Sequence, residues 1–137
     1  MQRNATAVWR GGLKEGSGVL RTQSGTLSDT KSDFRMRFED APGTNPEELV
    51  AAAHAGCFSM AFSARLGDRG ITPESVTTKS TITLEAGTLT KSELACEVKA
   101  TGADRAKVEE AAEEAKAGCP ISKVLNLEIS LDLTVLV

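Results

Sequence analysis

The chain has 137 residues, 40% of them hydrophobic, which suits one domain with a buried core over residues 1–137. Its formal net charge is -3, and the 16 basic and 19 acidic residues are scattered, so nothing favours binding to nucleic acid or to an anionic membrane surface. No uninterrupted apolar run reaches the roughly 18 residues of a membrane span, and the N-terminus lacks a signal-like apolar stretch. We therefore expect a soluble, cytoplasmic protein with no nucleic-acid or membrane partner.

The N-terminal third predicts an antiparallel meander. It holds three short runs rich in β-branched and aromatic residues and separated by glycines: residues 4–11, 16–28 and 32–40. In the third run, Phe34, Met36 and Phe38 alternate with charged residues that include Arg35 and Arg37. Read as a strand, this run has one core face and one face that carries two guanidinium groups.

A long helix is expected from Pro46 to about Gly67. Asn45 is a good N-cap, proline suits the first helical position, and Glu48 falls at the capping-box position. Glu47, beside it, has no evident capping role. The segment is apolar nearly all round, which predicts a central buried helix. The residues expected on its main apolar face are Leu49, Ala53, Gly56, Cys57, Met60 and Ala64.

The second half predicts a hairpin, two helices and a last strand. Alternating segments over residues 74–87 and 88–102 meet at a turn near Gly87. A helix over residues 103–118 carries an apolar stripe, and a short helix over residues 119–125 follows. The final strand over residues 127–137 has one buried face. The predicted order is βββ-α-ββ-α-α-β, an α+β fold.

The three cysteines are too few for a disulfide scaffold: Cys57, Cys96 and Cys119. The sequence contains no CxxC pair that would suggest a zinc knuckle. Cys96 is in phase with apolar strand residues and is interpreted as core. Cys57 lies next to Gly56, which leaves space beside the sulfur. Cys119 sits at a helix junction before Pro120, where the helix dipole favours a thiolate. The last two cysteines are therefore the candidates for chemistry.

Several segments resemble one family. The stretches "RFED", "GTNPEELVAAAHAGCFSMA" and "KAGCPISKVL", with "GTLS" early and "EISLDL" late, are similar to the OsmC/Ohr family of thiol-dependent organic hydroperoxide reductases, and within it to the OsmC branch. The resemblance covers nearly the whole chain. It implies an OsmC-like fold, with antiparallel strands around a long central helix, in an intertwined homodimer.

The resemblance also implies residue roles. Cys57 is the expected peroxidatic thiol and Cys119 the resolving thiol, while Arg37 and Glu47 organise the peroxidatic thiol. A thiol of ordinary pKa is only about 3% ionised at pH 7, and a guanidinium in contact lowers that pKa by about 1 to 3 units. Arginine suits the role because it stays charged when partly buried and its fork also holds a carboxylate.

The spacing of Glu47 and Cys57 along the helix bears on the assembly. Ten residues separate Glu47 from Cys57, which is a rise of about 15 Å along one helix. One arginine cannot join a carboxylate and a sulfur that far apart. We therefore expect the arginine and the glutamate to come from a second chain, so that a homodimer interface closes the site.

The implied cycle makes a sulfenic acid on Cys57, then a disulfide with Cys119, which an external dithiol reduces. Family members use dithiols of the lipoyl type. An apolar lining, with Met36, Phe38 and Phe58 as candidates, would favour an organic hydroperoxide as substrate. No nucleotide, flavin or haem motif is seen, so neither a cofactor nor a metal is expected.

Two other interpretations stay open. His54 and Cys57 form an H-x-x-C pair that, with Cys119, offers three ligands to a metal. Alternatively, the thiols of a redox sensor would oxidise once and signal to a partner without sustained turnover.

Overall fold

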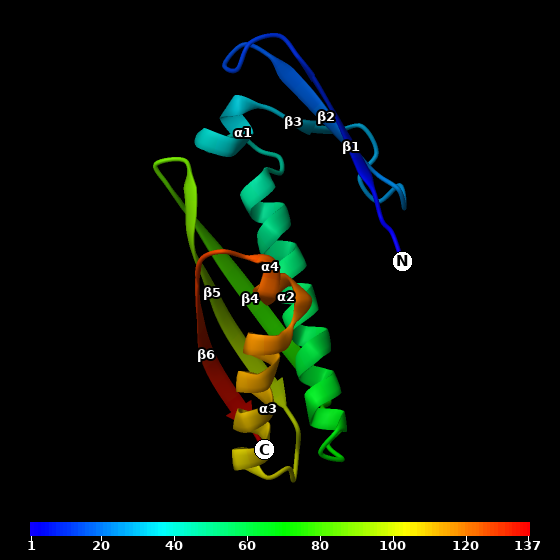
Figure 1. Ribbon diagram of the computed structural model, residues 1–137, viewed down its shortest axis with the longest axis vertical. Coiled ribbons are helices and arrows are strands. Elements are labelled where there is room, and N and C mark those ends of the chain that lie inside the picture. Colours follow the sequence, from blue (N-terminus) through cyan, green and yellow to red (C-terminus); the bar gives the residue numbers. More distant parts are fainter. The chain divides into compact units, whose positions relative to one another are not determined.

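A computed structural model describes all residues, 1–137, as six strands and four helices (Figure 1). The elements are β1 (Ala5–Arg10), β2 (Ser17–Thr22), β3 (Thr30–Ser32), α1 (Phe34–Phe38), α2 (Pro46–Gly67), β4 (Ser75–Glu85), β5 (Thr88–Lys99), α3 (Arg105–Gly118), α4 (Pro120–Val124) and β6 (Glu128–Leu136). The chain divides into two compact units, Met1–Leu49 and Val50–Val137, with the boundary inside α2. Each unit is described by itself.

The first unit contains the predicted meander. Strands β1, β2 and β3 form one antiparallel sheet in that order, with Val8 opposite Val19 and Gly18 opposite Ser32. A Cβ atom at Gly18 would lie 2.7 Å from the ring of Trp9 and 3.0 Å from the carbonyl oxygen of Ser32. Only glycine therefore lets the indole approach the middle strand this closely.

The third predicted strand was wrong over residues 34–38, which form helix α1. The carboxylate of Asp33 caps this helix by accepting a 3.0 Å hydrogen bond from the backbone N–H of Met36. The rings of Phe34 and Phe38, four residues apart, pack with centroids 4.9 Å apart, as helical spacing requires. Alternation over five residues was too short to exclude one helical turn. The observed order is βββ-α-α-ββ-α-α-β.

The start of α2 agrees with the prediction. Asn45 caps it, since its Oδ1 accepts a 2.8 Å hydrogen bond from the backbone N–H of Glu48, and Pro46 is the first helical residue. The expectation of burial all round was wrong in this single chain. The buried stripe has a four-residue period and consists of His54, Phe58, Phe62 and Leu66. On the face predicted to be buried, Met60 is 76% exposed.

Helix α2 is also long and apolar enough to cross a membrane when judged by length and composition alone. Its buried stripe, however, belongs to the core of residues 50–137, where Phe58, Phe62 and Leu66 pack with residues of β5 and α3. Helix α2 thus contributes one buried face to this core.

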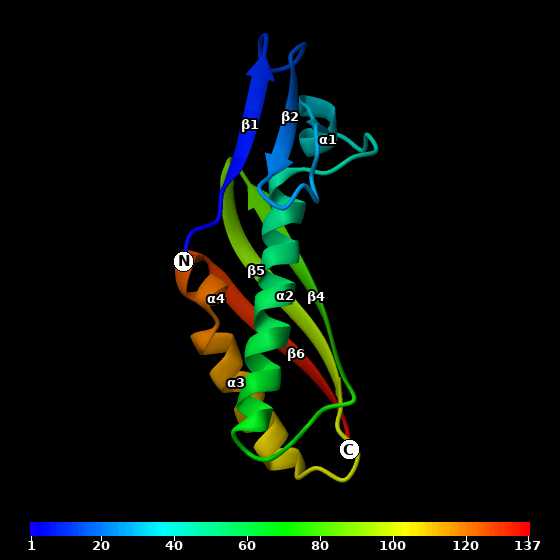
Figure 2. The ribbon, with the colours of Figure 1, turned by 90° about the vertical axis from the view of Figure 1, so that its right-hand side faces the viewer.

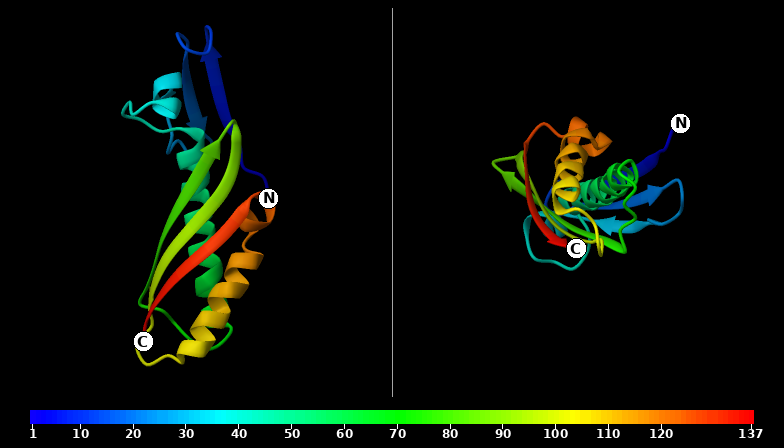
Figure 3. Two further views of the ribbon diagram at one scale, coloured as in Figure 1. Left: turned by 90° about the vertical axis from the view of Figure 1, so that its left-hand side faces the viewer. Right: turned by 90° about the horizontal axis from the view of Figure 1, so that it is seen from below.

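The second unit is a three-stranded sheet with helices on one face. Figures 2 and 3 show α2 and α3 side by side against the sheet β4-β5-β6. Along β5, residues alternate between buried and exposed, and Cys96 lies in the core between Leu94 and Val98 as predicted. The predicted apolar stripe of α3 is also buried: Val108, Ala111, Ala112 and Ala115.

The expectation that all strands are antiparallel was wrong for β6, which pairs parallel to β5. Helices α3 and α4 connect these two strands and return the chain to the end of the sheet where β5 begins. A parallel pair needs a crossover of this kind.

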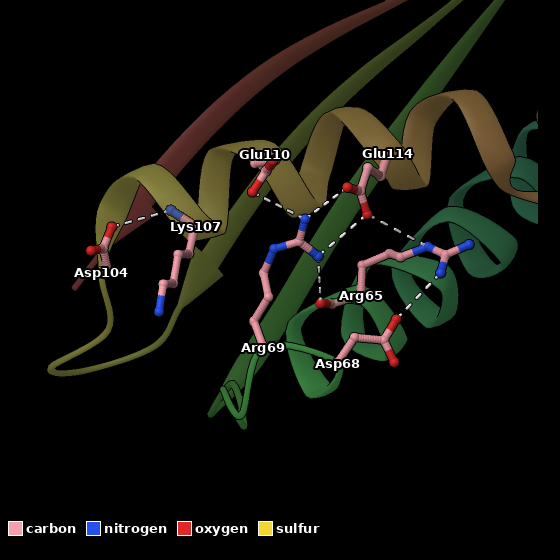
Figure 4. A network of polar contacts seen from close by, with 7 residues as sticks. All are labelled: Arg65, Asp68, Arg69, Asp104, Lys107, Glu110 and Glu114. Carbon is pink, nitrogen blue, oxygen red and sulfur yellow. Dashed lines mark hydrogen bonds and ion pairs between the residues drawn. The ribbon is translucent and has the colours of Figure 1, made fainter.

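An ion-pair network ties the end of α2 to α3 (Figure 4). The guanidinium of Arg69 contacts Glu114 at 2.7 Å and Glu110 at 3.1 Å, and it donates to the carbonyl oxygen of Arg65 at 3.0 Å. Arg65 in turn pairs with Asp68 at 3.3 Å. The hydrogen bond from Arg69 is the main cause that lowers the pKa of Glu114. The network fixes α2 beside α3, and the chain passes from α3 directly to Cys119.

The turn between β4 and β5 offers a stabilising substitution. Ala86 and Gly87 form the two-residue loop, and both have positive φ, 49° and 79°. Alanine tolerates this left-handed conformation poorly, whereas Asn-Gly is a preferred pair for such a turn. We expect Ala86→Asn to raise the free energy of unfolding by about 0.5–1 kcal/mol in urea denaturation. Ala86→Val should lower it, and an equal effect of both would contradict the argument.

Candidate functional site

The structure brings Cys57 and Cys119 together in the second unit. Cys57 is partly exposed in the middle of α2, and Cys119 is fully buried where α3 ends and α4 begins. No disulfide joins them, yet they are neighbours, because each thiol influences the pKa of the other and the backbone of Ile121 influences both. Sixty-two residues of sequence separate a pair that is in contact in space.

The two thiols differ in acidity. Burial raises the pKa of Cys57, the backbone N–H of Ile121 opposes this, and the neighbouring Cys119 raises it further. Burial also acts to raise the pKa of Cys119, but hydrogen bonds from Ser122, Cys57 and Ile121 outweigh it, so the pKa ends below its ordinary value. No cation is among the groups that set the acidity of Cys57. Within residues 50–137, no cation therefore activates the more exposed thiol.

Local structure explains the environment of Cys119. Its Sγ accepts a 3.3 Å hydrogen bond from the backbone N–H of Ser122 and lies 3.2 Å from the hydroxyl of the same residue. Pro120, with its fixed φ, starts the short helix α4 and turns this N–H toward the sulfur. The predicted helix junction is present.

Arg37 and Glu47 meet in the first unit. Glu47 Oε1 accepts two hydrogen bonds from Arg37, at 3.1 Å from Nε and 2.8 Å from Nη2. The side chain of Glu47 is 14% exposed and that of Arg37 is 41% exposed. The pair leaves Nη1 of the guanidinium and Oε2 of the carboxylate without these bonds, so both groups keep atoms for a further partner.

A cavity of about 410 Å³ also lies in the first unit. Its wall is mainly apolar, with Trp9, Phe34 and Phe38, and Arg37 contributes a charge. Of the three residues proposed for a substrate lining, only Phe38 is part of this wall. The side chain of Met36 lies instead against Gly43, where an added Cβ would come 2.6 Å from its sulfur.

Phe58, the third residue proposed for the lining, lies in the second unit. It is fully buried and packs against Phe62 with ring centroids 5.7 Å apart. The structure therefore places it in the core of residues 50–137.

A family model for OsmC-like proteins matches residues 38–134, which include both thiols and Glu47. The chain is also 45% identical to the protein named peroxiredoxin OsmC of Escherichia coli (strain K12), and the match covers 96% of this chain and 95% of that one. The chain belongs to the OsmC family.

Solved structures agree with this assignment. An organic hydroperoxide resistance protein OsmC from Legionella pneumophila superposes with a TM-score of 0.68 at 27% identity, covering 98% of this chain and 97% of that chain. The organic hydroperoxide resistance protein OhrB of Bacillus subtilis gives a TM-score of 0.66 at 27% identity over 96% and 98% of the two chains. The predicted OsmC-like α+β fold and its long helix are confirmed. As an OsmC protein, with a peroxiredoxin relative at this identity, the chain is a thiol-dependent peroxidase.

Sequence reasoning missed a polar partner set around the one histidine of this OsmC protein. The fully buried His54 bonds through Nδ1 to Ser92 Oγ at 2.6 Å and through Nε2 to Ser122 Oγ at 2.8 Å. Both ring nitrogens are thus engaged by hydroxyls, and no cluster of three metal-ligating side chains is found. Ser92 occupies a core-facing position of β5, and a serine in that phase was the signal that could have revealed the contact.

The burial of His54 predicts a pH dependence of stability. Burial lowers its pKa, so below pH 6.5 the unfolded chain binds a proton that the folded chain resists. The stability that this group contributes is fully present above about pH 6.5 and is lost as the pH falls toward the lower folded pKa, with a limiting slope of about 1.4 kcal/mol per pH unit. Urea denaturation between pH 7 and pH 5 measures it. The chain has one histidine, so His54→Gln should remove this slope, and an unchanged slope would contradict the assignment.

Proposed function

We propose that this OsmC family member reduces organic hydroperoxides to alcohols, with Cys57 as the peroxidatic thiol and Cys119 as the resolving thiol. The observation that carries the proposal is the contact between two unbonded thiols, one partly exposed and the other fully buried. The partly exposed sulfur of Cys57 is the one that a substrate can reach. The buried sulfur of Cys119 can then attack the oxidised Cys57 without access to solvent.

The Cys57 thiolate attacks one oxygen of the hydroperoxide, the S–O bond forms and the O–O bond breaks, and the departing alkoxide takes a proton to become an alcohol. The Cys119 thiolate then attacks the sulfenic sulfur of Cys57, the S–S bond forms, and hydroxide leaves to become water. An external dithiol, of the lipoyl type, reduces the disulfide by two thiol–disulfide exchanges.

Activation of Cys57 requires a cation, and we assign it to Arg37 of a second copy of the chain. Glu47 holds Arg37 in place by two hydrogen bonds, and ten residues of helix, about 15 Å of rise, separate Glu47 from Cys57. The α2 face that carries Ala53, Gly56 and Met60 is exposed in the single chain, and an added Cβ at Gly56 would meet nothing within 4 Å. An exposed apolar face beside the thiol is the surface on which a second copy would pack.

The apolar wall of the cavity in the first unit indicates the class of substrate. The cavity carries Trp9, Phe34 and Phe38 beside the Arg37 that would reach the partner's site. Each buried methylene of an alkyl hydroperoxide gains about 0.8 kcal/mol from desolvation, which hydrogen peroxide cannot gain. The proposed substrate is therefore an organic hydroperoxide in the cytoplasm.

Counting free thiols tests the proposal. Reduced protein contains three cysteines, and one equivalent of tert-butyl hydroperoxide should lower the free-thiol count from three to one within the mixing time of the assay. The remaining thiol should be that of Cys96, which is 3% exposed in the core. Three surviving thiols would overturn the proposal. Sustained turnover with a dithiol would in addition exclude a sensor that oxidises only once.

A further inference from the structure

A continuous row of hydrogen bonds runs from the buried thiol of Cys119 across the second unit. Ser122 Oγ lies 3.2 Å from Cys119 Sγ and 2.8 Å from His54 Nε2. His54 Nδ1 lies 2.6 Å from Ser92 Oγ, which lies 3.1 Å from Ser80 Oγ. Four elements supply the row beyond Cys119: α4, α2, β5 and β4 in turn.

Most of this row is closed to solvent. His54, Ser92 and Cys119 are fully buried and Ser122 is 8% exposed, whereas Ser80 at the far end is partly exposed. A buried imidazole needs two partners, and the two serines satisfy that need. Packing alone does not explain why Ser122, one of these partners, also contacts Cys119, a thiol that has to ionise.

We assign one direction to the row while Cys119 is a thiol. While Cys119 is a thiol, its S–H donates to Ser122 Oγ and the hydroxyl of Ser122 donates to His54 Nε2. The neutral ring then carries its proton on Nδ1 and donates to Ser92.

Ionisation of Cys119 reverses each of these bonds. The hydroxyl of Ser122 then donates to the thiolate, and Nε2 of His54 donates to Ser122. The neutral ring now carries its proton on Nε2, and Nδ1 accepts from Ser92. The ring tautomer is thereby coupled to the charge on the sulfur.

We propose that His54 is a positioning residue for the resolving thiol, and that its tautomer switches with the ionisation of Cys119. This inference rests on the proposed function, because it concerns the second step of that cycle. As Cys119 ionises, each hydrogen bond passes one proton along: Cys119 to Ser122, Ser122 to His54, His54 to Ser92, Ser92 to Ser80. One proton leaves at the exposed end, and the thiolate is free to attack the sulfenic sulfur of Cys57.

The charged surroundings agree with a neutral relay. Burial alone lowers the pKa of His54, and no charged group contributes to it. The titratable groups next to the row are the thiols of Cys119 and Cys57, of which the second is replaced in the test below. Over the pH range in which Cys119 is titrated, the ring therefore stays neutral and exchanges one N–H for the other.

Nitrogen-15 NMR of histidine-labelled protein tests the inference without peroxide. The chain has one histidine, so the spectrum contains a single pair of ring nitrogens. In Cys57→Ser protein, raising the pH through the titration of Cys119 should move the ring from the Nδ1–H to the Nε2–H form. The same tautomer at both ends of the titration would overturn the inference.

Three variants sharpen the result. Ser122→Ala should uncouple the tautomer from the pH, and Ser122→Thr, which keeps the hydroxyl, should restore the coupling. Ser59→Ala is the matched control, because Ser59 lies on α2 but bonds to Thr78 at 2.8 Å, outside the row. Coupling that survives in Ser122→Ala would overturn the relay.

Rapid mixing separates this inference from the proposed function. In Ser122→Ala with Cys57 intact, disulfide formation should slow by at least about 10-fold while the preceding oxidation of Cys57 keeps its rate. Unchanged disulfide formation would overturn the role of the row. Failure of Cys57 to oxidise in the wild-type protein would instead overturn the proposed function, and the NMR titration would still decide the relay.

Discussion

The Cys57→Ser variant is expected to lose hydroperoxide reduction by at least about 1,000-fold, because a serine hydroxyl is not ionised near neutral pH and a peroxide bond requires the thiolate as nucleophile. The consumption of tert-butyl hydroperoxide in the presence of excess dithiol measures the loss. The fold should survive, since the side chain is only partly buried and oxygen is smaller than sulfur.

Two matched variants show whether the loss is specific. Cys119→Ser should still be oxidised once by the peroxide and should accumulate a sulfenic acid on Cys57, which a dimedone-type reagent captures. Cys96→Ser should retain activity, because Cys96 lies on the core face of β5 and takes no part in the cycle. Retained turnover in Cys57→Ser, or its loss in Cys96→Ser, would contradict the assignment.

Replacing Arg37 with methionine should lower the rate of Cys57 oxidation at pH 7 by at least about 10-fold, because a guanidinium in contact lowers the pKa of a thiol and its removal leaves less thiolate. The rate should recover as the pH rises and the thiol ionises without the cation. Arg35→Met is the matched control, since Arg35 lies on the same helix and pairs instead with Glu39 at 3.4 Å. A loss of activity at pH 7 that higher pH does not repair would argue against an electrostatic role.

Mixed dimers decide which chain supplies the arginine. A Cys57→Ser chain keeps Arg37, and an Arg37→Met chain keeps Cys57, so each homodimer is impaired. If the arginine acts across the interface, the mixed dimer regains one complete site and about half of the wild-type activity. If the arginine acts within its own chain, the mixed dimer contains no complete site and its activity stays low. Activity of a dissociated monomer would likewise contradict the shared site.

The features that sequence predicted well were those set by local chemistry. Asn45 and Pro46 mark the start of α2, and the stripe of α3 follows directly from the spacing of its alanines. The candidate thiols came from motifs that are themselves short stretches of sequence. Such features depend on neighbours within a few positions.

The features that sequence missed depend on partners far along the chain. Residues 34–38 alternate like a strand, but the Asp33 cap and the Phe34–Phe38 pair make them helical. The parallel pairing of β6 follows from the crossover through α3 and α4, which alternation within a strand does not report. The His54 contacts join residues 38 and 68 positions apart, and no local pattern encodes them.

In the proposed cycle, the unequal exposure of the two sulfurs also determines how the oxidised enzyme is reset. An incoming dithiol meets Cys57, which is partly exposed, and not Cys119, which is fully buried. Attack at Cys57 makes Cys119 the leaving group, and a sulfur whose pKa is lowered departs faster. The hydrogen bonds that make Cys119 a ready nucleophile in the forward direction thus also give the disulfide a single productive direction of cleavage. The mixed disulfide formed during reduction should therefore join the reductant to Cys57.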